Sequence, residues 1–64
     1  VAAAAAQLAV EPNAEVRAGL IVLIGSAVAT DPAAKAALVA HFHRETVPDL
    51  LALIGRFVSV EDLR

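Results

Sequence analysis

Residues 15–30 read EVRAGLIVLIGSAVAT and are followed at once by Asp31-Pro32. This stretch predicts a helix that is apolar on nearly every side and that stops sharply. Asp-Pro is a typical helix start, because aspartate caps the first turn and proline fits its first position. A helix that is apolar on two faces needs packing neighbours on both. The stretch therefore predicts a helix packed between other helices.

The larger side chains of this helix gather on one side when residues are placed at about 100° intervals. They are Val16, Leu20, Leu23, Ile24 and Ala27, with Ile21 and Val28 at the edge. The opposite side holds small residues around Val22, namely Ala18, Gly19, Gly25, Ser26 and Ala29. Glycine inside a helix costs ~1 kcal/mol relative to alanine, so two glycines indicate close approach of another helix. A helix with loosely specified packing is the alternative.

Capping residues divide the chain into helices. The expected ranges are about 1–10, 14–30, 32–42, 47–54 and 60–64. Asn13 and Asp31 are the expected N-caps of the second and third helices. The chain has no strand alternation and no hairpin-turn dipeptide. We therefore expect an all-α fold of antiparallel helices.

The later helices carry their own start and stop signals. Thr46 and Asp49 have the spacing of a capping box before the fourth helix, and Ser59 and Asp62 repeat that spacing before the fifth. Gly55 is the expected C′ residue that ends the fourth helix.

The composition predicts that the chain packs against something else. Its hydrophobic fraction is 59%, above the ~45–50% of ordinary soluble domains, while a chain of 64 residues buries only about 60% of its unfolded surface. We therefore expect residues 1–64 to be a single α-helical unit and a fragment of a larger helical domain or array. The residues expected to be critical for packing are Gly19, Leu20, Leu23, Ile24, Gly25, Val28, Leu50, Leu51 and Ile54.

Charge and cysteine content exclude several classes of function. Five basic and seven acidic residues give a net charge of −2, with no basic stripe for nucleic acid. The absence of cysteine excludes disulfides and thiolate metal sites. The uncharged run 18–29 is shorter than the ~20 residues of a membrane span. The sequence does not determine the compartment, and a cytoplasmic location is favoured.

No residue pattern indicates catalysis or a cofactor. The acidic residues fall almost entirely at helix starts, where capping explains them. Ser26 and Ser59 lack a neighbouring base or glycine elbow, and Gly19, Gly25 and Gly55 are isolated rather than grouped in a phosphate-binding loop. We therefore expect a protein that is not an enzyme.

Two polar features inside the helices have alternative explanations. His41 and His43 would point about 200° apart on a helix, so we expect solvated histidines at a helix end rather than a metal site. Arg17 lies within the apolar helix. It either extends its charged end to the surface or forms an ion pair with an acid from an adjacent helix.

Three segments together resemble an armadillo or HEAT-like helical repeat. They are Asn13-Ala14-Glu15-Val16-Arg17 with the apolar helix after it, Thr30 to Val39 around Asp31-Pro32, and Val47-Pro48-Asp49-Leu50-Leu51-Ala52-Leu53-Ile54. The stretch Ile24-Gly25-Ser26-Ala27-Val28 is similar to armadillo-type nucleotide-exchange factors of heat-shock chaperones. His41-Phe42-His43-Arg44-Glu45 stands where the family usually has a glycine turn. The resemblance implies stacked repeats that act as a protein-binding or scaffold segment.

Two other interpretations remain open. Residues 14–64 also resemble the C-terminal domain of TetR-type repressors, which implies an effector-binding and dimerisation segment with the DNA-binding helices outside this chain. A small helical subunit of a large assembly is the third interpretation. The expected partners are a protein or neighbouring helices of the same chain or complex, with no direct contact to nucleic acid and with a membrane disfavoured; the repressor alternative adds a small effector.

Overall fold

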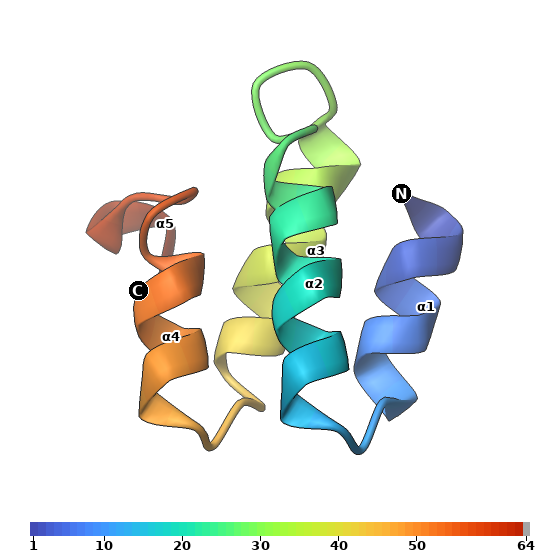
Figure 1. The fold of residues 1–64 in the computed structure, drawn as a ribbon. Coiled ribbons are helices and arrows are strands. Elements are labelled where there is room, and N and C mark those ends of the chain that lie inside the picture. Colours follow the sequence, from blue (N-terminus) through green and yellow to red (C-terminus); the bar gives the residue numbers. More distant parts are fainter. Residues whose placement is uncertain (64) are drawn as a thin grey trace.

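The computed structural model describes residues 1–63, which form helices and no strand. The helices are α1 (Ala2–Val10), α2 (Ala14–Gly25), α3 (Pro32–Phe42), α4 (Pro48–Ile54) and α5 (Val60–Leu63). Helices α1 to α4 run alternately down and up, so that consecutive helices are antiparallel (Figure 1). The predicted all-α class is confirmed. Arg64, at the end of the predicted range 60–64, lies outside the described residues.

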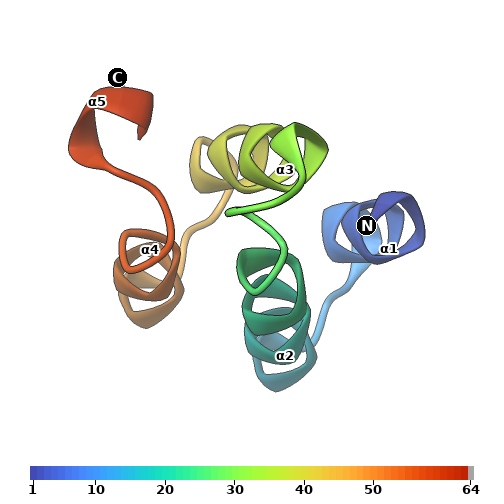
Figure 2. The same ribbon diagram turned by 90° about the horizontal axis from the view of Figure 1, so that it is seen from above.

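The helices form two rows. Seen from above, α1, α3 and α5 lie in one row and α2 and α4 in the other (Figure 2). Contacts run within the rows, α1 with α3, α3 with α5 and α2 with α4, and also between the rows. Helix α3 contacts all four of the other helices, so it is the element around which the others are placed.

Two helix starts follow from the polar residue that precedes them. The Asn13 side-chain oxygen accepts hydrogen bonds from the backbone N–H groups of Glu15 at 2.8 Å and Val16 at 3.2 Å. The Asp31 carboxylate accepts one from the backbone N–H of Ala33 at 2.9 Å. Each cap satisfies N–H groups that have no partner inside the helix. Asn13 and Asp31 are the N-caps, as the sequence predicts.

The start and the end of α4 differ from the prediction. The N-cap is Val47, without a side-chain hydrogen bond, and the Thr46–Asp49 capping box is absent because the backbone N–H of Thr46 donates to the Glu45 carboxylate at 3.0 Å. Gly55 has φ −61°, a right-handed conformation. It therefore does not act as the left-handed C′ residue that we predicted.

The short helix α5 has the predicted capping box. The backbone N–H of Ser59 donates to the Asp62 carboxylate, and the backbone N–H of Asp62 donates to the Ser59 hydroxyl, each at 3.3 Å. Asp62 also pairs with Lys35 of α3 at 2.8 Å. Hydrogen bonds from Lys35 and then from Ser59 lower the pKa of this carboxyl. The pair is exposed and therefore adds little stability.

Helix α2 is shorter than the predicted 14–30. It ends at Gly25, and residues 26–30 form tight turns in which the N–H of Ala27 bonds the carbonyl of Ile24 at 3.0 Å. The Ser26 hydroxyl donates to the carbonyl of Leu23 at 2.7 Å. Serine hydroxyls compete with helical hydrogen bonds in this way, and this explains why the helix stops five residues early.

The hydrophobic core draws on α1 to α4 and the segment that follows α4. Its buried members are Leu8, Ile21, Ile24, Ala34, Leu38, Leu50, Ile54 and Val58. Leu20 and Val28 pack against this core while partly exposed, and Leu51 is also partly exposed.

The buried face of α2 differs from the predicted stripe. Ile21 and Ile24 are buried, whereas Val16 is 45% and Leu23 59% exposed. A Cβ at Gly19 would have no atom within 4 Å. The packing roles predicted for Leu23 and Gly19 are therefore wrong. The buried face of α2 is rotated by about 100° from the predicted stripe, the angle between successive residues of a helix. It is centred on Ile21, Ile24 and the largely buried Arg17.

Gly25 is the point of closest approach on α2. It is buried, and a Cβ there would lie 2.5 Å from Cγ of the Phe57 ring. The residue that approaches is thus an aromatic side chain from the segment after α4, and not another helix backbone. The ring occupies the volume that any larger residue would need.

We predict that Gly25→Ala destabilises the protein and that Gly19→Ala does not. The methyl group at position 25 forces Phe57 to move, and overpacking of this kind costs about 1–3 kcal/mol. The methyl group at position 19 meets nothing and removes a helical glycine, a gain of about 0.5–1 kcal/mol. Urea denaturation of both variants measures the two effects. Equal stability of the two variants would contradict the packing at Gly25.

Candidate functional site

The most elaborate polar arrangement is centred on the carboxylate of Glu45, in the turn between α3 and α4. Its side chain is 2% exposed. Arg17 of α2 approaches with two nitrogens, Nε at 3.0 Å from Oε1 and Nη2 at 3.2 Å from Oε2. This is the two-pronged geometry that makes arginine–carboxylate pairs strong and directional. Of the two alternatives for Arg17, a charged end at the surface or an ion pair with an acid from elsewhere in the fold, the structure shows the ion pair.

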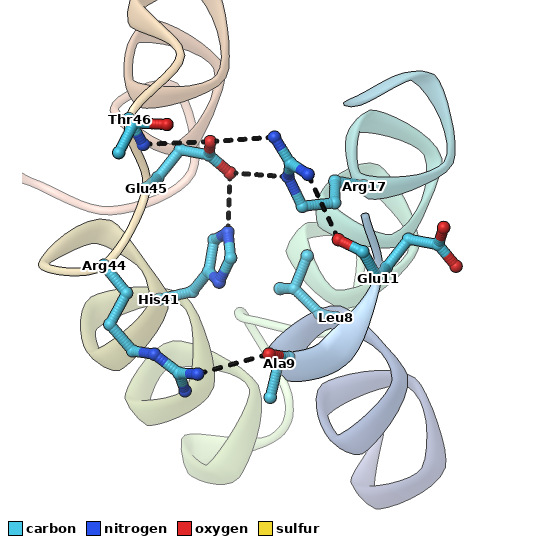
Figure 3. Close-up of a pocket in the computed structure, with 8 residues that line it drawn as sticks. All are labelled: Leu8, Ala9, Glu11, Arg17, His41, Arg44, Glu45 and Thr46. Carbon is cyan, nitrogen blue, oxygen red and sulfur yellow. Dashed lines mark hydrogen bonds and ion pairs between the residues drawn. The ribbon is translucent and has the colours of Figure 1, made fainter. Parts of the chain in front are cut away.

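Three further donors complete the Glu45 site. Nε2 of His41 lies 2.7 Å from Oε1, and the backbone N–H groups of Thr46 and Val47 donate to Oε2 at 3.0 and 3.1 Å. Oε1 therefore accepts from two donors and Oε2 from three. Figure 3 shows the Arg17 guanidinium to the right of the Glu45 carboxylate and the His41 ring below it. Such saturation is what a buried charge requires.

These contacts determine the protonation of Glu45. Burial by itself would raise its pKa, but hydrogen bonds from His41, the Val47 N–H, Arg17 and the Thr46 N–H outweigh it and lower the pKa from 4.5 to about 2. A carboxylate with such a low pKa and no free lone pair is a poor general base at neutral pH. The arrangement is suited to holding segments together rather than to proton transfer.

Arg17 also binds the chain that leaves α1. Its Nη1 donates to the carbonyl of Glu11 at 3.1 Å and to that of Pro12 at 2.9 Å. These carbonyls follow the last turn of α1, where helical carbonyls lack partners. One guanidinium therefore connects the end of α1, helix α2 and the α3–α4 turn.

His41 is not the solvated residue that the sequence predicts. It is 9% exposed, its Nε2 faces Glu45, and its Nδ1 is buried without a hydrogen-bond partner. The separation of four residues between His41 and Glu45, at the end of α3 and in the turn after it, is the signal that could have revealed the pair. His43 is exposed, and its ring meets the edge of Phe42.

A surface cavity of about 200 Å³ adjoins this cluster. Its lining residues are Leu8, Ala9, Glu11, Arg17, His41, Arg44, Glu45 and Thr46, which come from α1, α2 and the end of α3 with the turn after it (Figure 3). Arg44 of this lining donates from Nη2 to the carbonyl of Ala9 at 3.2 Å. Within residues 1–63, no group of three His, Cys, Asp or Glu side chains gathers as a metal site.

Comparison of the chain with protein-family models, with curated proteins and with solved structures finds no match. None of the helices in the described part of the chain has the length and apolar character needed to cross a membrane.

We predict that Glu45→Gln destabilises the protein strongly. The substitution keeps the shape of the side chain but leaves Arg17 without its counter-charge, and breaking a buried pair costs about 3–5 kcal/mol. Glu15→Gln is the matched control, because Glu15 is exposed in the first turn of α2 and contributes only about 0.3–1 kcal/mol through the helix dipole. Urea denaturation at neutral pH compares them. Similar losses in both variants would contradict a structural role for Glu45.

We also predict an acid-sensitive component of stability. The pKa of Glu45 is lower in the folded state, about 2 against 4.5, so its contribution is complete above pH 4.5 and is lost as the pH falls toward 2. The difference corresponds to about 3 kcal/mol. The free energy of unfolding of the native chain should therefore approach that of Glu45→Gln over this range. A gap that stays constant down to pH 2 would contradict the prediction.

Proposed function

We propose that this chain is a segment of an α-helical repeat protein, armadillo- or HEAT-like, and that it acts as a non-catalytic protein-binding or scaffold element. The observation that carries the proposal is the arrangement in two rows, in which α1, α3 and α5 follow one another in one row and α2 and α4 in the other. In helical repeats each unit contacts its neighbours in this way, and stacking makes one continuous core.

The outer side of α1 supports stacking against further helices. Its inner side carries Leu8, which is 2% exposed, while Val10 on the outer side is 74% exposed. Ala2 and Ala6 share that outer side and are also exposed. A helix whose outer side is apolar and uncharged suits close packing with another helix.

A second exposed apolar face supports binding of a protein partner. Val16, Val22 and Leu23 of α2 are 45%, 48% and 59% exposed. Because they lie on the side of α2 that faces away from the core, they are free to contact another molecule. Grouped aliphatic side chains of this kind mark interaction surfaces on soluble proteins.

The test of this proposal is sedimentation over a concentration series, combined with circular dichroism of the 64-residue chain. We expect concentration-dependent association, because the free side of α1 packs against other copies. Ala6→Glu places a charge on that side and should shift the chain toward monomer. Ala36→Glu, on an exposed position of α3, is the matched control and should associate like the native chain.

A chain that stays monomeric at every concentration and melts cooperatively would be a self-sufficient domain, and the repeat-segment proposal would fail.

A further inference from the structure

A second hollow, of about 150 Å³, adjoins the cavity described above. Four residues line both hollows, His41 and Arg44 among them. We call the two together the α1–α3 groove. Alanines of α1 and α3, namely Ala5, Ala37 and Ala40, line only the second hollow. The groove therefore has an apolar end, and the two polar side chains lie where that end begins.

The contact with Glu45 makes the other ring nitrogen of His41 an acceptor. The Glu45 carboxyl, with a pKa of about 2, is ionised at neutral pH and can only accept hydrogen bonds. Nε2 of His41, 2.7 Å from Oε1, is therefore the donor. In a neutral imidazole the second nitrogen then carries a lone pair and no hydrogen. Nδ1 thus requires a partner that donates.

Residues 1–63 supply no donor to Nδ1. His41 is only 9% exposed, and its Nδ1 is buried without a hydrogen bond. Figure 3 shows Nδ1 on the side of the ring that faces Leu8, away from Glu45. A buried acceptor without a donor carries a desolvation cost, and a ligand that donates to it removes that cost.

Arg44 adds hydrogen-bond donors to the same groove. In the part of the chain that the structure describes, its side chain makes one hydrogen bond, to the Ala9 carbonyl at 3.2 Å, and no ion pair. Its other N–H groups can therefore donate to a ligand. Because Arg44 is exposed and held by this single bond, it is the lining side chain that shifts most easily to admit a ligand.

We propose that the α1–α3 groove binds a small unbranched primary alcohol. The hydroxyl donates its hydrogen to Nδ1 of His41 and accepts a hydrogen bond from Arg44, so a single oxygen serves both groups. The hydrocarbon chain lies along Ala5, Leu8 and Ala37. An apolar lining with a few polar groups that fix orientation is typical of small-molecule sites. The inference does not depend on the repeat proposal.

The first experiment establishes which nitrogen of the His41 ring carries the hydrogen. Nitrogen-15 NMR of the 64-residue chain at neutral pH distinguishes a ring nitrogen that bears a hydrogen from one that does not. We expect the hydrogen on Nε2 and a bare Nδ1. A hydrogen on Nδ1 would overturn the proposal, because that nitrogen could then not accept a hydrogen bond.

The second experiment titrates the same chain with 1-butanol and follows the His41 ring nitrogens and the Arg44 side-chain N–H groups. We expect a saturable shift at Nδ1 and at Arg44. Methyl propyl ether, an isomer of 1-butanol that accepts but does not donate, should bind about tenfold more weakly or less, because it leaves Nδ1 without a partner. Linear changes with 1-butanol, or equal affinity for the ether, would overturn the proposal.

Matched variants on α3 test where the hydrocarbon chain lies. Ala40 is exposed and lines the apolar end of the groove, so Ala40→Leu fills that end and should weaken 1-butanol binding by about tenfold or more. Ala36 is also exposed but lines neither hollow, and Ala36→Leu should bind like the native chain. Circular dichroism confirms that both variants are folded. Equal affinity of the two variants would overturn the site.

A last titration separates a free alcohol from the serine side chain of a protein partner. N-acetylserinamide carries the same hydroxyl on a body with two amide groups, and the alanines at the apolar end of the groove offer those groups no side-chain partner. It should therefore bind more weakly than 1-butanol. Equal or tighter binding would overturn the assignment to a free alcohol.

Discussion

The structure depends on one buried carboxylate. Glu45 receives donors from α2 through Arg17, from α3 through His41, and from the backbone that leads into α4. Through Arg17 the same cluster also holds the carbonyls that follow α1. Two regions that are distant in the sequence, residues 11–17 and residues 41–47, thus meet at one negative charge. Their relative positions are fixed by hydrogen-bond directions, which apolar contacts alone do not supply.

A buried ion pair is an expensive way to gain stability. Removing two charges from water costs several kcal/mol each, and attraction between them offsets this only with good geometry and with every remaining lone pair satisfied. Glu45 meets both conditions, since Arg17 approaches with two nitrogens and three other donors complete the site. We infer that the cluster sets the register between the α1–α2 hairpin and the α3–α4 hairpin, while the aliphatic core supplies most of the stabilisation.

The sequence predicts the helices better than their faces. Asn13 and Asp31 are recognisable because a cap acts on backbone N–H groups only two or three residues away. The same local logic fails at Thr46, whose N–H is taken by Glu45. It also fails in part on α2, where the predicted stripe includes Ile24, which is buried, but also Val16 and Leu23, which are exposed. Ile21, expected only at the edge of the stripe, is fully buried. On a helix that is apolar on nearly every side, the hydrophobic period does not identify which face is buried. Directional contacts with other segments then contribute to the orientation of the helix.

On α2 that contact is made by Arg17. An arginine on an apolar helix ordinarily marks the side that faces solvent. Here Arg17 points inward because its guanidinium pairs with the carboxylate of Glu45, 28 residues further along the chain. The sequence contains two separate indications, an arginine without a local partner and a histidine and a glutamate four residues apart at the end of α3. Neither indication identifies the Arg17–Glu45 pair, because the sequence separation of two residues that pair across helices follows no fixed rule. The face of α2 that carries Arg17 also buries Ile21, Ile24 and Gly25, so the ion pair and the apolar core agree on the rotation that leaves its valines and Leu23 exposed.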